Sequence, residues 1–243
     1  MAIYPGGKNG SGVYQAIINL MPKHQIYVEA FLGGGAILRN KKPARFNFGF
    51  DLDDTVFGFF KDLKFDYLDL INDSFLNGLE KESDFSRVLK AEKIRNNEVL
   101  IYADPPYLKT VRKSKRPIYK YEFWTETEHE KLLTFIKSLP FNVMISGYDS
   151  PLYNEMLSTW RKASFNTTNR AGQKTTEIVW LNFPEPFELH DYSFLGDDFR
   201  ERERIHKKRK RLKKRLLEMD KYERLALIAT VEEIKTLQLT STF

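Results

Sequence analysis

Short apolar segments alternate with helical patterns through the first 184 residues of this 243-residue chain. Such alternation predicts an α/β fold, in which a mostly parallel sheet carries helices on both faces. Ligands of these sheets bind at the carboxyl ends of the strands, so the residues that follow each strand are the first candidates for a site. We expect strands near residues 26–30, 46–50, 99–103, 141–147 and 176–183, and helices near residues 9–20, 35–41, 53–63, 126–138 and 151–159.

Two further stretches have local signals of their own. Residues 64–98 mix polar residues with apolar residues at helical spacing, and we interpret them as two short helices. Thr125 is followed three residues later by Glu128. This spacing is typical of a capping box, which predicts a helix that starts after Thr125.

The third expected strand ends in Asp104-Pro105-Pro106-Tyr107. Proline has a fixed φ and no N–H group, so the pair ends the strand and stiffens the turn. The Asp104 carboxylate and the Pro105 carbonyl can then act as two outward acceptors beside the flat Tyr107 ring. This combination suits the exocyclic amino group of a flat heterocycle, and we expect the reaction centre here. The alternative is a strand end with a plain Pro-Pro turn.

The first expected strand runs through Glu29 into a glycine-rich turn, 30–35. Glycine after a strand accepts positive φ and lets the backbone pass close to a ligand. The spacing differs from the dinucleotide fingerprint, because no third glycine follows at the required offset. The alternative is an ordinary strand-to-helix turn.

The second expected strand ends in Asp51, 16 residues after Gly35. In doubly wound folds an acid at this place accepts hydrogen bonds from ribose hydroxyls. The alternative role of Asp51 is to cap the following helix, for which Asp54 is better suited. Near the N-terminus, the turn at 4–8 ends in Lys8 and either holds a carboxylate or phosphate or is a surface turn.

Together these segments resemble the Dam-like DNA adenine methyltransferases, which use S-adenosylmethionine. The stretches that carry the resemblance are YPGGK at 4–8, EAFLGGGAIL at 29–38, FDLDD at 50–54, DPPY at 104–107, VMISGY at 143–148 and TEIVWLN at 176–182. Ala30 departs from the family, which usually has proline there. The stretch between the glycine turn and DPPY is also short, and Dam carries its target-recognition domain at that place.

The resemblance implies a Rossmann-like methyltransferase sheet, S-adenosylmethionine as cofactor and no metal. It implies that Asp104, Pro105, Pro106 and Tyr107 form the catalytic turn, with Tyr107 stacked on a flipped base. The residues that it places around the cofactor are Tyr4, Pro5, Gly6, Gly7, Lys8, Glu29, Ala30, Phe31, Gly33, Gly34, Gly35, Asp51, Leu52 and Asp104.

Positive charge is concentrated near the end of the chain. Residues 200–224 hold 13 Lys and Arg against 5 Asp and Glu, whereas the whole chain has a net charge of only +6. Residues 197–239 have a helical pattern with one apolar stripe. A basic helical segment beside a near-neutral domain indicates a polyanion partner. The alternative is a solvated helix or a short coiled coil.

Basic and aromatic residues follow the catalytic turn at 108–124. A second basic stretch, at 167–174, precedes the last expected strand. Such residues suit phosphate contacts and base stacking, and the alternative is a solvated loop or a hairpin turn. With the basic helix they give the expected DNA contacts: Lys109, Arg112, Lys113, Lys115, Arg116, Tyr119, Lys120, Tyr121, Arg170, Lys174, Lys207, Lys208, Arg209, Lys210 and Arg211.

Several classes of protein are disfavoured by composition. The chain has no cysteine, which excludes disulfides and thiolate metal sites. No apolar run reaches the roughly 20 residues that a membrane helix needs, and we see no signal peptide. The four histidines show no ligand spacing. We expect a cytoplasmic protein of a bacterial or phage-infected cell.

The combined prediction is a catalytic domain at 1–190 and a basic helical segment at 191–243. The predicted function is site-specific transfer of a methyl group from S-adenosylmethionine to N6 of adenine in double-stranded DNA. The alternatives are an RNA adenine methyltransferase, a silent nucleic-acid-binding protein of the same fold, and methylation of the cytosine amino group. We expect a monomer or a weak dimer with no membrane partner.

Overall fold

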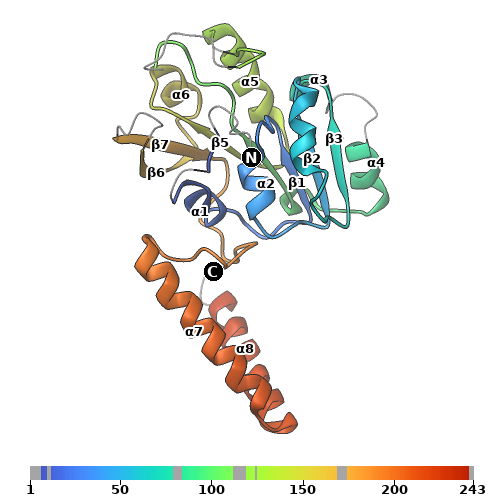
Figure 1. Cartoon of the computed structure of the whole chain (residues 1–243), viewed down its shortest axis with the longest axis vertical. Coiled ribbons are helices and arrows are strands. Elements are labelled where there is room, and N and C mark those ends of the chain that lie inside the picture. Colours follow the sequence, from blue (N-terminus) through green and yellow to red (C-terminus); the bar gives the residue numbers. More distant parts are fainter. Residues whose placement is uncertain are drawn as a thin grey trace. The chain divides into compact units, whose positions relative to one another are not determined.

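The computed structural model describes residues 7–9, 12–78, 84–111, 119–123, 125–168 and 174–240 (Figure 1). Contacts divide the chain into two compact units, Met1–Phe194 and Leu195–Phe243. The first unit holds a seven-stranded sheet and the second holds two long helices.

The sheet of the first unit has the strand order β3-β2-β1-β4-β5-β7-β6. The five strands from β3 to β5 pair in parallel, whereas β7 runs antiparallel to both β5 and β6. The predicted Rossmann-like α/β fold with a mostly parallel sheet is confirmed. The strands are β1 (Ile26–Glu29), β2 (Phe46–Phe50), β3 (Leu68–Ile71), β4 (Val99–Ala103), β5 (Asn142–Gly147), β6 (Arg161–Thr168) and β7 (Lys174–Leu181).

Helices cover both faces of the sheet, because the central strands are apolar on both faces. Successive side chains of a strand point to opposite faces. In β4, Ile101 and Ala103 therefore join one core cluster, while Leu100 and Tyr102 join the other. The first cluster also contains residues of α3 (Phe75–Gly78), α4 (Asp84–Ala91), α5 (Glu126–Ser138) and α6 (Pro151–Met156), and the second contains residues of α1 (Val13–Ile18), α2 (Ala36–Asn40) and the 3-10 helix η1 (Asp54–Phe60).

Two strands were not predicted. The interpretation of residues 64–98 as two short helices is wrong in part, because β3 precedes α3 and α4 there, with the short 3-10 helix η2 (Asn96–Glu98) after them. The side chains of β3 are half-buried at this edge of the sheet, so the segment lacks the apolar run of a central strand. Strand β6 was missed for a similar reason, since exposed and half-buried side chains alternate along it.

One of the two predicted helix caps is confirmed and the other is wrong. The Thr125 capping box is confirmed, since Thr125 accepts from the Glu128 N–H and the Glu128 side chain accepts from the Thr125 N–H. The preference for Asp54 as the cap of the earlier helix is wrong. Asp53 is the cap of η1, and its carboxylate accepts from the Thr55 N–H at 3.2 Å. The cap must precede the first helical residue, and Asp54 is already that residue.

The second unit consists of α7 (Phe199–Glu218) and α8 (Lys221–Thr240), as the helical pattern predicted. Asp198 begins α7 by accepting from the Glu201 N–H at 2.8 Å. Among the described residues, no helix of either unit has the length and apolarity needed to cross a membrane.

Candidate active site

A pocket opens at the carboxyl ends of β1, β2, β3 and β4, where the topology predicts a ligand site. Most of the residues expected around the cofactor line it: Gly7, Lys8, Glu29, Ala30, Phe31, Gly33, Gly34, Gly35, Asp51, Leu52 and Asp104. Tyr4, Pro5 and Gly6 lie outside the described residues. The sequence did not indicate a second wall, made of Asp73, Ser74, Phe75 and Leu76 after β3, or a third, made of Tyr119, Tyr121, Glu122 and Phe123.

The glycine turn and Asp51 form one hydrogen-bonded corner of this pocket. Gly33 and Gly35 have φ values of 47° and 57°, a conformation that favours glycine. A Cβ atom on Gly35 would lie 2.2 Å from the Phe60 ring. The Gly33 N–H donates to Asp51 at 2.7 Å, and the Asp53 N–H donates to the other carboxylate oxygen at 2.9 Å. Burial raises the pKa of Asp51, and these two N–H groups oppose the shift.

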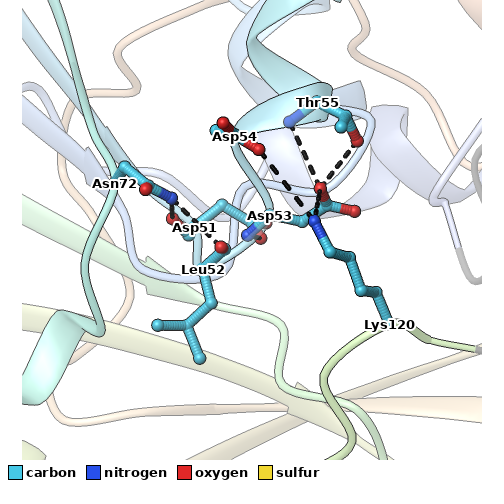
Figure 2. Close-up of polar contacts among 7 residues, drawn as sticks. All are labelled: Asp51, Leu52, Asp53, Asp54, Thr55, Asn72 and Lys120. Atoms are coloured by element: carbon cyan, nitrogen blue, oxygen red, sulfur yellow. Dashed lines mark hydrogen bonds and ion pairs between the residues drawn. The ribbon is translucent and has the colours of Figure 1, made fainter.

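The rim of the pocket beside Asp51 is drawn in Figure 2. Asn72 donates to the carbonyls of Asp51 and Leu52 at 3.1 and 3.0 Å, which ties β3 to the end of β2. Across the rim, the Lys120 ammonium lies 3.0 Å from Asp53 and 4.0 Å from Asp54. These contacts link the segment at 119–123 to the opposite wall of the pocket.

Glu29 lines the pocket and is almost fully buried. Its carboxylate accepts from the Leu38 N–H at 2.9 Å and from the Tyr27 hydroxyl at 3.1 Å. Burial raises the pKa of Glu29 to about 8, although both hydrogen bonds oppose the shift. Glu29 thereby fixes α2 to the end of β1 directly after the glycine turn.

Asp104 belongs to a cluster of charged side chains at the end of β4. The Lys8 ammonium lies 2.6 Å from Asp104 and 3.2 Å from Glu177 of β7, and it also donates to the Tyr107 hydroxyl. The Tyr107 hydroxyl in turn donates to Glu177. Burial raises the pKa of Asp104 to about 6, with Lys8 opposing the shift and Glu177 adding to it. Burial alone would lower the pKa of Lys8, but the two carboxylates outweigh it and raise that pKa.

Glu177 was not singled out from the sequence, although it stands in one of the stretches that carry the family resemblance. Only 4% of it is exposed, and glutamate is rarely buried to this degree unless it is paired. Its signal in the sequence is a charged residue directly before the apolar run at 178–181.

The Asp104–Tyr107 turn is contacted by His129 of α5. Its Nε2 lies 3.2 Å from the Pro106 carbonyl and 3.0 Å from the Phe123 carbonyl, and its Nδ1 lies 2.8 Å from the Tyr153 hydroxyl. Burial lowers the pKa of His129, so the ring is neutral at pH 7, with one nitrogen donating and the other accepting. Pro105 is buried, and Tyr107 is half-buried with its ring edge-on to Tyr148.

Residues 67–176 match the model of the D12 class N6 adenine-specific DNA methyltransferases. This part of the chain is similar to that family. The predicted resemblance to adenine methyltransferases is thereby confirmed, and the matched segment includes the Asp104–Tyr107 turn.

Solved structures of low identity cover most of the chain. The N-methyltransferase NodS from Bradyrhizobium japonicum is 8% identical with a TM-score of 0.45, and the match covers 69% of this chain and 92% of that one. An rRNA methylase from Streptococcus thermophilus is 12% identical with a TM-score of 0.40 and the same shares. The magnesium protoporphyrin IX methyltransferase ChlM from Synechocystis is 8% identical with a TM-score of 0.41, covering 69% and 74%. A search of curated protein sequences gives no significant match.

The residues expected to contact DNA fall into three groups by their position in the structure. Tyr119 and Tyr121 line the pocket, and Lys120 between them is paired with Asp53. Lys109, Lys174 and the α7 residues Lys207, Lys208, Arg209, Lys210 and Arg211 are exposed. Arg112, Lys113, Lys115, Arg116 and Arg170 lie outside the described residues. Within the described part of the chain, no group of three or more His, Cys, Asp or Glu side chains is arranged to hold a metal ion.

Proposed function

We propose that the protein transfers the methyl group of S-adenosylmethionine to the N6 amino group of adenine in DNA. The observation that carries this proposal is the pocket that runs from Asp51 to Asp104 within a chain that matches the D12 class. One end of the pocket suits a ribose, and the other presents acceptors to an amino group.

The pocket fits the proposed cofactor in its chemistry. Asp51 offers carboxylate oxygens to the ribose hydroxyls, while the glycine turn brings backbone close to the ligand without side chains in the way. Phe31, Leu52 and Phe75 supply an apolar wall for an adenine ring. When bound, S-adenosylmethionine supplies a methyl group that is already activated by its positive sulfur.

Asp104 and Pro105 have the central role in the proposed reaction. The lone pair of the adenine amino group is delocalised into the ring, which makes the nitrogen a weak nucleophile. Hydrogen bonds from that group to the Asp104 carboxylate and the Pro105 carbonyl favour a pyramidal nitrogen with a free lone pair. The remaining task is in-line positioning, which is worth several kcal/mol.

The charges around Asp104 also suit the product of transfer. Methylation makes the amino nitrogen positive until it loses a proton. Asp104 and Glu177 share the single ammonium of Lys8, so the cluster presents net negative charge to the developing cation. Fixed charge aimed at the place where charge develops lowers the barrier.

DNA as the substrate rests on the family match and on the basic helix α7. A base in a duplex must first leave the stack, at a cost of a few kcal/mol. Tyr107 then offers its ring to the flipped base, and its hydroxyl is held by Lys8 and Glu177.

Radiolabelled methyl transfer to unmethylated DNA and to RNA tests the proposal. We expect label in DNA with the wild-type protein and a loss of at least about 100-fold with Asp104→Asn, because removal of one preorganised polar group typically costs that much. Asp66→Asn, an exposed acid in the same unit, is the matched control and should retain full activity. Label in RNA alone would support the RNA alternative, and cofactor binding with no transfer would support a silent nucleic-acid-binding protein.

A further inference from the structure

Glu177 is joined to the catalytic turn from a distant strand of the sheet. It stands on β7, which pairs antiparallel with β5 and is separated from β1 and the glycine turn by β4 and β5. Its carboxylate nevertheless lies 3.2 Å from the Lys8 ammonium and accepts from the Tyr107 hydroxyl. Glu177 does not line the cofactor pocket.

The contact between Lys8 and Asp104 poses a difficulty that Glu177 can resolve. At 2.6 Å from Oδ1, the ammonium holds one of the two oxygens of the carboxylate that the substrate amino group needs. If Asp104 were the single partner of Lys8, turning Asp104 toward the substrate would leave a buried ammonium without a counterion. An unpaired buried charge is strongly unfavourable.

We propose that Glu177 is a positioning residue that retains Lys8 and the Tyr107 hydroxyl while Asp104 accepts the substrate amino group. This inference rests on the proposed function and adds a residue to its machinery. The Lys8 ammonium has three hydrogens and lies within hydrogen-bond reach of three oxygens, on Asp104, Tyr107 and Glu177. When Asp104 turns away, Lys8 therefore keeps two partners, one of which carries a full negative charge.

Other titratable groups face this cluster without taking part in its hydrogen bonds. Glu29 of β1, Tyr102 of β4 and Tyr153 of α6 are close enough to Asp104 for charge interactions. Burial raises the pKa of Tyr102, so its hydroxyl stays neutral, and it is within 2.8 Å of the Ser146 hydroxyl. Lys8 is thus the cation of the cluster, and Asp104 and Glu177 are its two carboxylates.

Glu177→Gln tests the inference because it keeps the size of the side chain and removes its charge. Lys8 then has Asp104 as its single carboxylate. We expect the kcat for methyl transfer to fall on the order of tenfold, since hydrogen bonds to charged groups have that worth, and we expect the Kd for S-adenosylmethionine to stay within about twofold.

A pH profile distinguishes positioning from a merely structural role. Removing the negative charge of Glu177 should move the acid limb of kcat/KM to lower pH, because Asp104 then ionises more easily. Lys8→Met should move that limb to higher pH. Glu155→Gln, an exposed glutamate on α6, is the matched control and should change neither kcat nor the limb. Wild-type kcat and an unshifted limb in Glu177→Gln would overturn the inference.

A measurement without turnover separates this inference from the proposed function. Carboxyl-labelled protein can be titrated by NMR in the wild type and in Glu177→Gln. The inference predicts that Asp104 titrates at lower pH in the variant, even if no nucleic acid is methylated under the conditions used. An unchanged Asp104 titration in a folded variant would contradict the inference, whereas failure of wild-type methyl transfer alone would count against the proposed function.

Discussion

Asp104 lies between the end of β4 and Pro105. Its surroundings determine the pH at which its carboxyl group ionises. Burial makes its ionised form less favourable, while the Lys8 ammonium at 2.6 Å makes it more favourable. The outcome is a carboxyl group that changes charge near neutral pH.

This environment predicts the pH dependence of the reaction. We propose that Asp104 acts as a carboxylate, which is the stronger acceptor for the amino group, and its pKa is raised to about 6. Activity should therefore fall as the pH drops through about 6 and reach a plateau above it. The profile of kcat/KM between about pH 5 and 8, in the range where proteins are usually most stable, checks this sign. Full activity at the acid end would show that Asp104 does not need its charge.

Asp51 gives a second prediction at the residue scale. Its carboxylate accepts from Gly33 and Asp53, so Asp51→Asn weakens the corner of the pocket and removes the charge that we propose faces the ribose. Calorimetric titration with S-adenosylmethionine should show an affinity lower by roughly 10- to 100-fold, the worth of a charged hydrogen bond. Asp62→Asn, which changes an exposed acid, should bind as the wild type does.

Individual site residues were predictable where they stand in a local sequence motif. The turn at Asp104 and the glycines after Glu29 stand out because proline and glycine have backbone properties that few other residues share. Glu177 did not stand out, because its partner Tyr107 is 70 positions away in the sequence. A glutamate that follows three polar residues in a strand is expected to be exposed until its partner is known.

At the scale of elements, the pocket has walls that local patterns do not reveal. The segment after β3 and the segment at 119–123 both line it. Strand β3 is a half-buried edge strand, and the second segment has no regular structure. Propensity is a weak guide for both, since tertiary packing decides their conformation. The central strands, by contrast, are apolar on both faces and were predicted closely.

The Lys120 contact yields a prediction for the wall at 119–123. Its pairing with Asp53 holds that segment against the opposite rim (Figure 2). Because half of the Lys120 side chain is exposed, solvent screens the pair and its contribution is small. Lys120→Met should therefore weaken S-adenosylmethionine binding by no more than about fivefold, with a smaller effect at high salt.

Calorimetric titration at low and high salt measures this effect. Lys131→Met, on the exposed face of α5, serves as its matched control. Equal affinities for wild type and Lys120→Met at low salt would show that the pair does not support the wall.

At the scale of the whole molecule, the two units differ in charge. Residues 200–224 carry 13 Lys and Arg, and those of the α7 cluster at 207–211 are exposed. Both the helix and its charge were predictable, because helical periodicity and composition are local properties. The exposure of the α8 side chains Leu225, Leu227 and Ile228 was not predictable, since burial depends on what lies nearby in space.

Charge reversal of Lys207, Lys208 and Lys210 tests the proposed role of α7. We expect weaker DNA binding and a salt dependence with a slope reduced by roughly 3, one for each phosphate that is no longer neutralised. The same reversal at Lys61, Lys64 and Lys131 of the first unit is the matched control. Filter binding from low to moderate salt measures both slopes. An unchanged slope for the α7 variant would indicate that α7 binds protein instead.

The most direct test of the central claim is to identify the methylated nucleoside. Purified protein is incubated with deuterated S-adenosylmethionine and unmethylated DNA or RNA, and the nucleosides are then separated by mass. We predict deuterated N6-methyldeoxyadenosine from DNA, and none with Asp104→Asn. Deuterium on cytosine, or on RNA alone, would contradict the proposed substrate, and an active Asp104→Asn variant would falsify the proposed centre.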